Sequence, residues 1–168
     1  MTLVIRPETP ADHAAIHDIT KRAFAPMVYA DGNEQDLIGR FREAGALAIS
    51  LVAEQDGAVV GQVTFTEAFA ADGSPGWHAL GPVAVEPALQ NRYIGSSLIE
   101  AGLAKLRGRD AAGCVLVGDP AYYQRFGFRL FPDLCPAGEP AAYYQILPLR
   151  ETTSDSVIAF HPLFYGSY

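Results

Sequence analysis

The chain has 168 residues, of which 49% are hydrophobic and 18% charged, so we expect one globular domain spanning residues 1–168 rather than a disordered chain. Its formal net charge of −7 argues against a nucleic-acid partner, since binding to a phosphate backbone needs clustered cations. Two cysteines, Cys114 and Cys135, are too few for a disulfide framework. The sequence has no apolar run of membrane-spanning length and no signal-peptide pattern, so we expect a cytoplasmic protein without a membrane partner.

The first part of the chain predicts a strand followed by two helices. Leu3–Ile5 is a short β-rich run, and Thr9 before Pro10 is typical of a helix start, with threonine as the N-cap. The helix that follows carries an apolar stripe of Ile16, Ile19 and Ala23. A second helix is predicted from Asn33 to Gly45, where glycine suits the end of a helix.

The middle of the chain changes to the period of two that is typical of strands. Ile49–Glu54 and Val59–Thr66 flank the turn sequence Gln55–Ala58, which contains Asp-Gly, so we predict a β-hairpin. A loop at Ala70–Gly76 separates this hairpin from a further strand at Val83–Val85.

The second half alternates helices and strands. A helix follows a loop that contains Gly95, a buried strand is predicted at Cys114–Val117, and Asp119 marks the N-cap of a helix over Ala121–Phe126. Three extended runs follow, at Phe128–Phe131, Tyr143–Leu147 and Val157–Phe160. This order predicts an α/β fold whose sheet combines antiparallel hairpins with a parallel pair beside the Gly95 loop.

The segment Leu80–Ile99 carries the strongest functional signal. It predicts a strand, then a loop that contains Gln90, Arg92 and Gly95, and then a helix. The N–H groups and the dipole at the start of a helix bind phosphate without needing a cationic side chain. The dinucleotide motif G-x-G-x-x-G uses a similar arrangement, but only Gly95 stands in this loop, so we exclude that motif.

The chain resembles the GNAT superfamily of N-acetyltransferases, in particular its bacterial YhbS-like subgroup. The resemblance rests on the element order, on Gln90–Gly95 beside the superfamily pattern Gln/Arg-x-x-Gly-x-Gly/Ala, and on Asp119–Phe128 beside a Tyr-x-x-x-Gly-Phe helix ending. It implies a mixed, mostly antiparallel sheet that splays apart at the cofactor cleft and is flanked by about four helices. It also implies acetyl-CoA as the acyl donor.

The resemblance assigns roles to residues of this segment. The backbone groups of Val83 and Val85 would run beside the pantetheine arm, and we expect their side chains in the core. The pyrophosphate would be held by Gln90, Asn91, Arg92, Tyr93, Ile94, Gly95 and Ser96. Tyr93 replaces the first glycine of the pattern; it could take a helical conformation with its ring turned away, or it could crowd the pyrophosphate.

Transfer from a thioester needs a proton for the departing sulfur, and the resemblance places Tyr123 as that general acid. The alternative makes Tyr123 a core aromatic; we expect Tyr122 to serve packing and Asp119 to serve as an N-cap. The sequence does not single out one residue as the base that deprotonates the amine. The candidates are Glu67, His78, Glu86 and His161, with a chain of waters as the alternative.

The resemblance therefore implies an N-acetyltransferase that moves an acetyl group from acetyl-CoA directly to a primary amine of a small molecule. We expect no metal, since no cluster has metal-ligand spacing. Two alternatives stay open: a non-catalytic module that binds or senses acyl-CoA, and a protein N-acetyltransferase. We expect acceptor specificity from the loops 26–32 (with Tyr29) and 70–76 and from the tail aromatics, which also offer a surface for a homodimer. These tail aromatics are Phe160, Phe164 and Tyr165.

Overall fold

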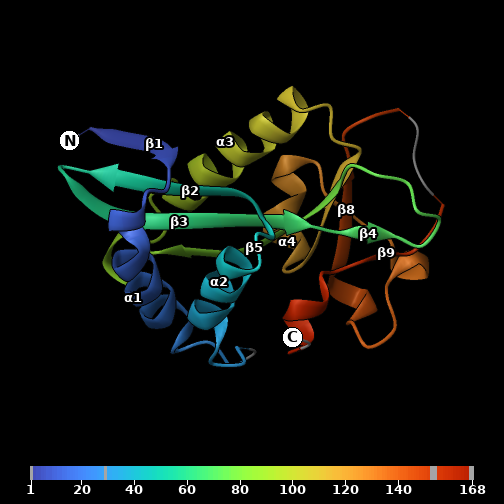
Figure 1. Ribbon diagram of the computed structural model, residues 1–168, viewed down its shortest axis with the longest axis horizontal. Coiled ribbons are helices and arrows are strands. Elements are labelled where there is room, and N and C mark those ends of the chain that lie inside the picture. Colours follow the sequence, from blue (N-terminus) through green and yellow to red (C-terminus); the bar gives the residue numbers. More distant parts are fainter. Residues whose placement is uncertain (1, 29, 152–154, 167–168) are drawn as a thin grey trace. The chain divides into compact units, whose positions relative to one another are not determined.

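The computed structural model describes residues 2–28, 30–151 and 155–166 (Figure 1). Its strands are β1 Leu3–Pro7, β2 Leu47–Gln55, β3 Ala58–Glu67, β4 Phe69–Ala70, β5 Trp77–Val85, β6 Gly113–Val117, β7 Arg129–Leu130, β8 Tyr144–Pro148 and β9 Ile158–Ala159. Its α-helices are α1 His13–Phe24, α2 Glu34–Glu43, α3 Ile94–Gly108 and α4 Pro120–Tyr123. Tyr29, which we expected in a specificity loop, lies outside the described residues.

Seven strands form one sheet in the order β1-β2-β3-β5-β6-β8-β7. β5 and β6 run parallel, whereas β1 with β2, β6 with β8, and β7 with β8 run antiparallel. The predicted mixed and mostly antiparallel sheet is confirmed. The predicted extended run Val157–Phe160 contains β9, Ile158–Ala159, which pairs with β4, Phe69–Ala70, in a small second sheet. The sequence did not predict β4, because two residues are too few to show a period.

The chain divides into two compact units. The first unit comprises Met1–Phe65 and Gly81–Leu103, and the second comprises Thr66–Leu80 and Ala104–Tyr168. That residues 1–168 fold as a single domain stays a prediction. None of the helices in the described ranges has the length and apolar character needed to cross a membrane.

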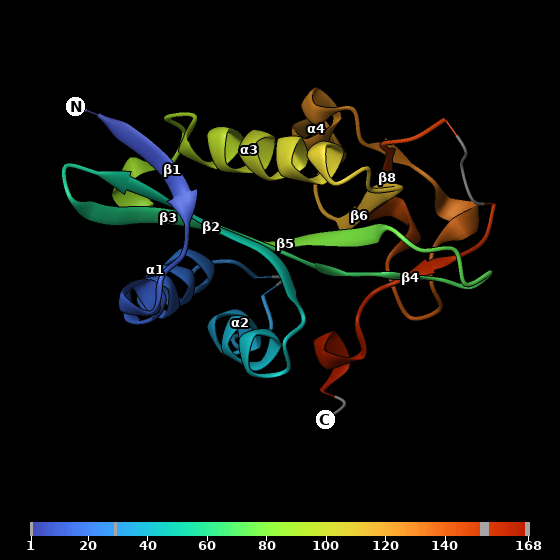
Figure 2. The same cartoon turned by 45° about the horizontal axis from the view of Figure 1, so that its top comes forward.

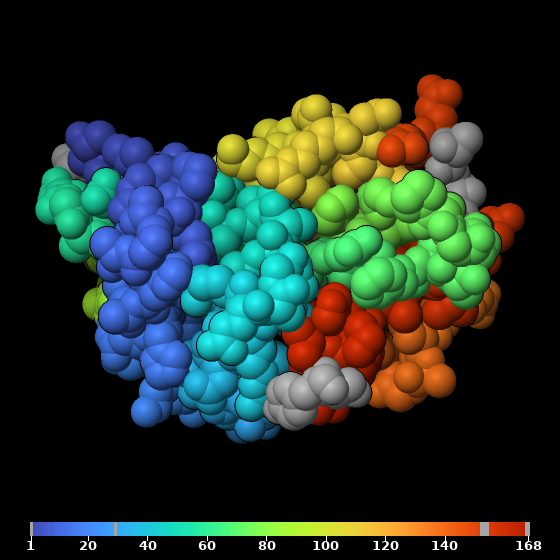
Figure 3. Space-filling view, viewed as in Figure 1, coloured from blue at the N-terminus to red at the C-terminus, as the bar shows by residue number. Residues whose placement is uncertain are grey.

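In the first unit, helices cover both faces of the β2–β3 hairpin (Figure 2). The predicted stripe of α1 is buried, and Ile19 and Ala23 pack against Ala84 of β5. α1 and α2 lie side by side and form a continuous surface, blue and cyan in Figure 3. The hairpin turn has positive φ angles at Asp56 (51°) and Gly57 (83°), as a type I′ turn requires.

The second unit is built around a cluster that includes Trp77, Val115 and Tyr144. The Tyr144 hydroxyl is buried and donates a hydrogen bond to the Ile158 carbonyl at 2.7 Å, which fixes the C-terminal segment. Phe160 and Phe164 are partly buried against this cluster. Our expectation of an exposed aromatic tail is therefore wrong for these two residues, because the tail packs back on the sheet.

A charged group is buried where α1 begins. Asp12 is 6% exposed, and its carboxylate accepts hydrogen bonds from the Arg6 guanidinium (2.7 and 3.0 Å) and from the Thr9 backbone N–H (2.7 Å). The Arg6 hydrogen bonds lower the pKa of Asp12 well below its usual range, although burial opposes this shift. The carboxylate is therefore ionised in the folded protein at all but very acidic pH.

We expect Asp12→Asn to lower the free energy of unfolding by about 2 kcal/mol at pH 7, because the change leaves a charged, partly buried partner unmatched. The pKa of Asp12 is lower in the folded than in the unfolded chain, so its stabilisation is present above the unfolded pKa of about 4 and is lost as the pH falls below it. Urea denaturation at pH 7 and pH 3 should show the difference in unfolding free energy between variant and wild type shrinking at low pH.

Glu54→Gln is the control for Asp12→Asn. Glu54 also contacts Arg6, at 3.6 Å, but is more exposed, so its loss should change the free energy of unfolding by less than about 1 kcal/mol. An Asp12→Asn effect of the same size at both pH values would contradict this assignment.

Candidate active site

Strand β5 contains one extra residue relative to its neighbour β3. The Ala68 N–H bonds the Trp77 carbonyl and the Glu86 N–H bonds the Val60 carbonyl, so β3 advances eight residues while β5 advances nine. The alternation of burial breaks at the same place, since Ala79 and Leu80 are both buried. These observations define a β-bulge in β5.

The bulge determines which backbone N–H and C=O groups of β5 point away from β3. The ladder between β5 and β6 runs from Trp77 to Ala79. Because hydrogen-bonded pairs alternate along an antiparallel ladder, the Glu86–Val60 bond turns the N–H and C=O groups of Val83 and Val85 away from β3. The Val85 carbonyl accepts a hydrogen bond from the Gln90 side-chain amide at 3.3 Å. An extended ligand with amide groups could pair with the Val83 N–H and C=O groups and with the Val85 N–H.

The side chains of Val83 and Val85 are half-buried rather than in the core. Ala84, between them, is the residue that packs against α1. Our expectation of core side chains at both valines is therefore wrong, because the alternation along β5 gives the inward position to Ala84.

The loop between β5 and α3 has an unusual backbone. It begins with a short 3₁₀ helix at Pro87–Leu89 and contains two non-glycine residues with positive φ, Asn91 (63°) and Tyr93 (65°). The side chains of Gln90, Asn91 and Arg92 are exposed. α3 begins directly afterwards at Ile94, so the first N–H groups of this helix stand at the end of the loop.

Tyr93 takes the left-handed conformation, not the helical one that we considered. This is the conformation that glycine adopts most easily. Tyr93 is 79% exposed, while its carbonyl accepts hydrogen bonds from the Ser97 N–H (3.0 Å) and hydroxyl (2.8 Å) at the start of α3. Tyr93 thus keeps the backbone path of a glycine and places its ring in solvent.

Glu86, at the start of this loop, is held by an ion pair. Both of its carboxylate oxygens face the Arg22 guanidinium of α1, with one contact at 2.8 Å, and Arg22 also contacts Asp18. These hydrogen bonds from Arg22 lower the pKa of Glu86. A carboxylate held in this way is a poor proton acceptor, which argues against Glu86 as the base.

Tyr123 stands on α4 in the second unit. The predicted N-cap is confirmed, since the Asp119 carboxylate accepts a hydrogen bond from the Ala121 N–H at 3.0 Å. The half-buried Tyr123 ring meets Phe128 edge to face, with centroids 6.0 Å apart. It also covers Gly118, where a Cβ atom would lie 2.5 Å from Tyr123 Cε2. These contacts fix the direction of the Tyr123 ring, whether Tyr123 serves as the general acid or as a core aromatic.

Tyr122 has a different environment from its neighbour. The Arg125 guanidinium lies over the Tyr122 ring at 4.4 Å, and Phe126 packs edge to face against the same ring. Tyr122 therefore serves packing, as expected.

The remaining base candidates differ in their surroundings. Burial lowers the pKa of the half-buried His78, and its Nδ1 atom has no hydrogen-bond partner among the described residues. In His161 the Nδ1 atom accepts a hydrogen bond from the Leu163 N–H at 3.1 Å. Glu67 is exposed at the end of β3. The described ranges contain no group of three or more His, Cys, Asp or Glu residues that could ligate a metal ion.

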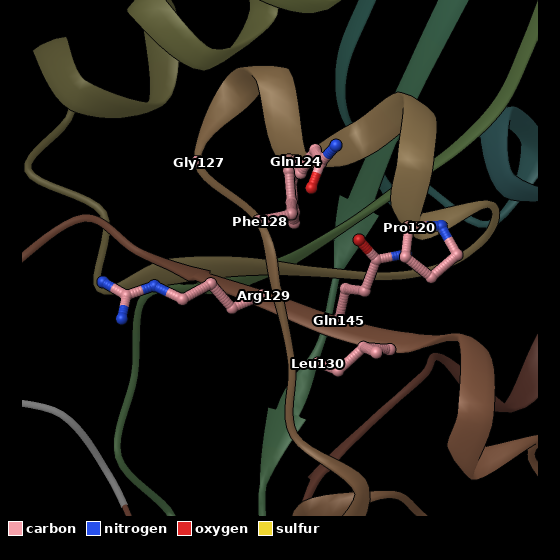
Figure 4. A pocket seen from close by; sticks show the side chains of 7 residues that line it. All are labelled: Pro120, Gln124, Gly127, Phe128, Arg129, Leu130 and Gln145. Atoms are coloured by element: carbon pink, nitrogen blue, oxygen red, sulfur yellow. The ribbon is translucent and has the colours of Figure 1, made fainter.

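The second unit also has an open cavity of about 400 Å³ between α4 and β7 (Figure 4). Its lining consists of Pro120, Gln124, Gly127, Phe128, Arg129, Leu130 and Gln145. The buried Gln145 amide donates a hydrogen bond to the Gly118 carbonyl at 2.9 Å. None of the site residues expected from the sequence lines this cavity.

Residues 47–130 match the acetyltransferase (GNAT) domain family. The chain is 33% identical over 129 residues to the uncharacterized N-acetyltransferase YhbS of Escherichia coli, which covers 76% of this chain and 74% of that protein. The chain belongs to the GNAT acetyltransferases. The predicted family and enzyme class, an acetyl-CoA-dependent N-acetyltransferase, are therefore confirmed.

Solved GNAT structures agree with this assignment. A GNAT family acetyltransferase from Brucella melitensis in complex with acetyl-CoA is 41% identical, with 97% of this chain and 98% of that chain covered and a TM-score of 0.86. Escherichia coli YhbS in complex with CoA is 28% identical, with 97% and 92% covered and a TM-score of 0.87. The roles of individual residues in this GNAT chain stay predictions.

Proposed function

We propose that this protein moves an acetyl group from acetyl-CoA directly to a primary amine of a small molecule, in a complex that holds both substrates. The segment Val83–Ser96 supports the proposal most strongly. It combines outward-facing backbone groups at Val83 and Val85 with a loop that ends at the first turn of α3. The outward-facing backbone groups suit pairing with an extended amide-containing chain, and the N–H groups at the first turn of α3 suit the binding of a phosphate.

The chain's own residues would divide the work as follows. Acetyl-CoA supplies the acetyl group as a thioester and departs as CoA. The first N–H groups of α3, with Gln90 and Arg92, would bind the pyrophosphate, and the Tyr123 hydroxyl would donate a proton to the departing sulfur. The acceptor amine would lose its proton to water or to a neutral side chain such as His78, whose pKa is lowered by burial.

Calorimetric titration with acetyl-CoA, CoA and dephospho-CoA tests the first half of the proposal. We expect micromolar binding, about −8 kcal/mol. Initial rates measured against both substrates test the second half: direct transfer predicts intersecting double-reciprocal lines, whereas a covalent enzyme intermediate predicts parallel ones. The absence of binding at millimolar CoA would overturn the proposal.

A second candidate is a module that binds acyl-CoA without turnover. The ion pair of Glu86 with Arg22 favours it, because that pair removes one candidate base. Binding of acetyl-CoA with no acetyl transfer to a panel of small primary amines would support this candidate. Transfer to any of them would exclude it.

The conformation of Tyr93 leads to a specific prediction for CoA binding. Tyr93→Gly should leave the CoA dissociation constant within about threefold of wild type, because glycine takes a φ of 65° freely. Tyr93→Pro should weaken binding at least about tenfold, because proline fixes φ near −65° and changes the path into α3. Titration of both variants with CoA measures this contrast. If Tyr93→Gly bound CoA much more tightly, the tyrosine ring would be shown to crowd the pyrophosphate.

A further inference from the structure

A chain of buried polar groups joins α1, β3 and β5 in the first unit. Gln62 and its partners Thr20 and Thr64 are all 0% exposed. The Gln62 Nε2 amide donates to Thr20 Oγ1 and to the Pro82 carbonyl, both at 3.3 Å. Thr64 Oγ1 donates to Gln62 Oε1 at 3.0 Å, and Thr20 Oγ1 donates to the Ile16 carbonyl at 2.7 Å.

The surroundings of this network are apolar, so packing alone does not explain why polar side chains stand here. Nearby, α1 meets the sheet through Ile16 and Val52, and through Ile19 and Ala84. A buried amide is stabilising only when its partners are all in place, and an apolar residue of similar volume would fill the same position without that demand. The feature specific to Gln62 is its bond to Pro82, which lies two residues after the bulge at Ala79–Leu80 in β5.

The bond to Pro82 fixes the direction of one peptide group. In a trans peptide the C=O and the following N–H point in opposite directions. Because Gln62 binds the Pro82 carbonyl from the β3 side, the Val83 N–H is directed to the opposite side of β5. The ladder with β3 gives the same direction to this N–H, so two separate contacts agree.

We infer that Gln62 is a positioning residue for acyl-donor binding: it holds the Pro82–Val83 peptide so that the Val83 N–H is oriented to pair with the pantetheine arm. The inference rests on the proposed function. Gln62 touches neither substrate and acts through Pro82. It should therefore affect the binding of CoA more than the rate of the chemical step.

Gln62→Met tests the inference, since methionine keeps the length of the side chain and removes its amide. We expect the CoA dissociation constant to rise about tenfold and kcat at saturating acetyl-CoA to stay within about threefold of wild type. Val63→Ala is the matched control, because Val63 is the next residue of β3, is 0% exposed and faces the other side of the sheet. It should be destabilised at least as much as Gln62→Met while binding CoA within about twofold of wild type.

The outcomes separate this inference from the proposed function. Wild-type protein that does not bind CoA would overturn both. Wild-type binding with no change in Gln62→Met, or with an equal change in Val63→Ala, would overturn the inference alone. Should Gln62→Met not fold, nuclear magnetic resonance of the wild type decides: on CoA addition, the Val83 amide and the Gln62 side-chain amide should shift together. A Val83 amide that CoA leaves unchanged would overturn the inference.

Discussion

Tyr123→Phe should lower kcat for acetyl transfer by about a hundredfold while leaving the dissociation constant of acetyl-CoA unchanged, as expected for loss of a general acid. The ring contacts of Tyr123 with Phe128 and Gly118 are made by carbon atoms, and phenylalanine keeps them. The substitution therefore isolates the hydroxyl. Steady-state rates at saturating acetyl-CoA, with binding measured separately by titration, give the two quantities.

Tyr122→Phe provides the matched control, since the two rings are neighbours on α4 with centroids 4.9 Å apart. The Tyr122 ring stacks with Arg125 through its π face, which phenylalanine preserves, so the rate should stay within about twofold of wild type. If Tyr123→Phe turned over as fast as Tyr122→Phe, the general-acid role would be wrong and Tyr123 would be a packing residue. A loss of acetyl-CoA binding in Tyr123→Phe would likewise contradict a role confined to proton transfer.

Most of the fold could be predicted because its signals are local. The stripe of α1, the Asp-Gly turn of the β2–β3 hairpin and the Asp119 N-cap each depend on residues close in sequence. The sheet order β1-β2-β3-β5-β6-β8-β7 was not predicted, since no local pattern fixes which strands are neighbours.

The site was harder to predict, because its geometry depends on contacts distant in sequence. Arg22 and Glu86 are 64 residues apart, and nothing near either residue marks the pair. The bulge in β5 follows from a register between β3 and β5 that becomes visible only when both strands are placed.

The sequence around Gln62 does show a local pattern. Along this strand, Gln62, Thr64 and Thr66 alternate with Gly61, Val63 and Phe65. That alternation predicts a solvent-facing side, whereas the structure buries all six positions.

Gly102 gives the second large effect, and here helix propensity and packing predict opposite signs. Gly102 lies within α3, where replacing glycine by alanine ordinarily stabilises a helix by about 1 kcal/mol. A Cβ atom at this position, however, would lie 2.2 Å from Cε2 and 2.5 Å from Cζ of Phe65. Phe65 is 0% exposed, so a shift of its ring would displace other close-packed side chains of the core. Since overpacking of a core costs about 3 kcal/mol at its upper range, we expect Gly102→Ala to lower the free energy of unfolding by about 2 kcal/mol.

Two further variants show whether the Phe65 ring causes this loss. Gly39→Ala places the same methyl group within α2, where a Cβ atom meets nothing within 4 Å, so it should raise the free energy of unfolding by about 0.5–1 kcal/mol. Adding Phe65→Leu to Gly102→Ala should cost less than the two single effects combined, with a coupling of at least about 1 kcal/mol measured by urea denaturation. Additive effects, or a Gly102→Ala variant as stable as Gly39→Ala, would mean that α3 shifts to accept the methyl group. Opposite signs at the two helical glycines would show that the α3 backbone at Gly102 packs closely against the Phe65 ring of β3.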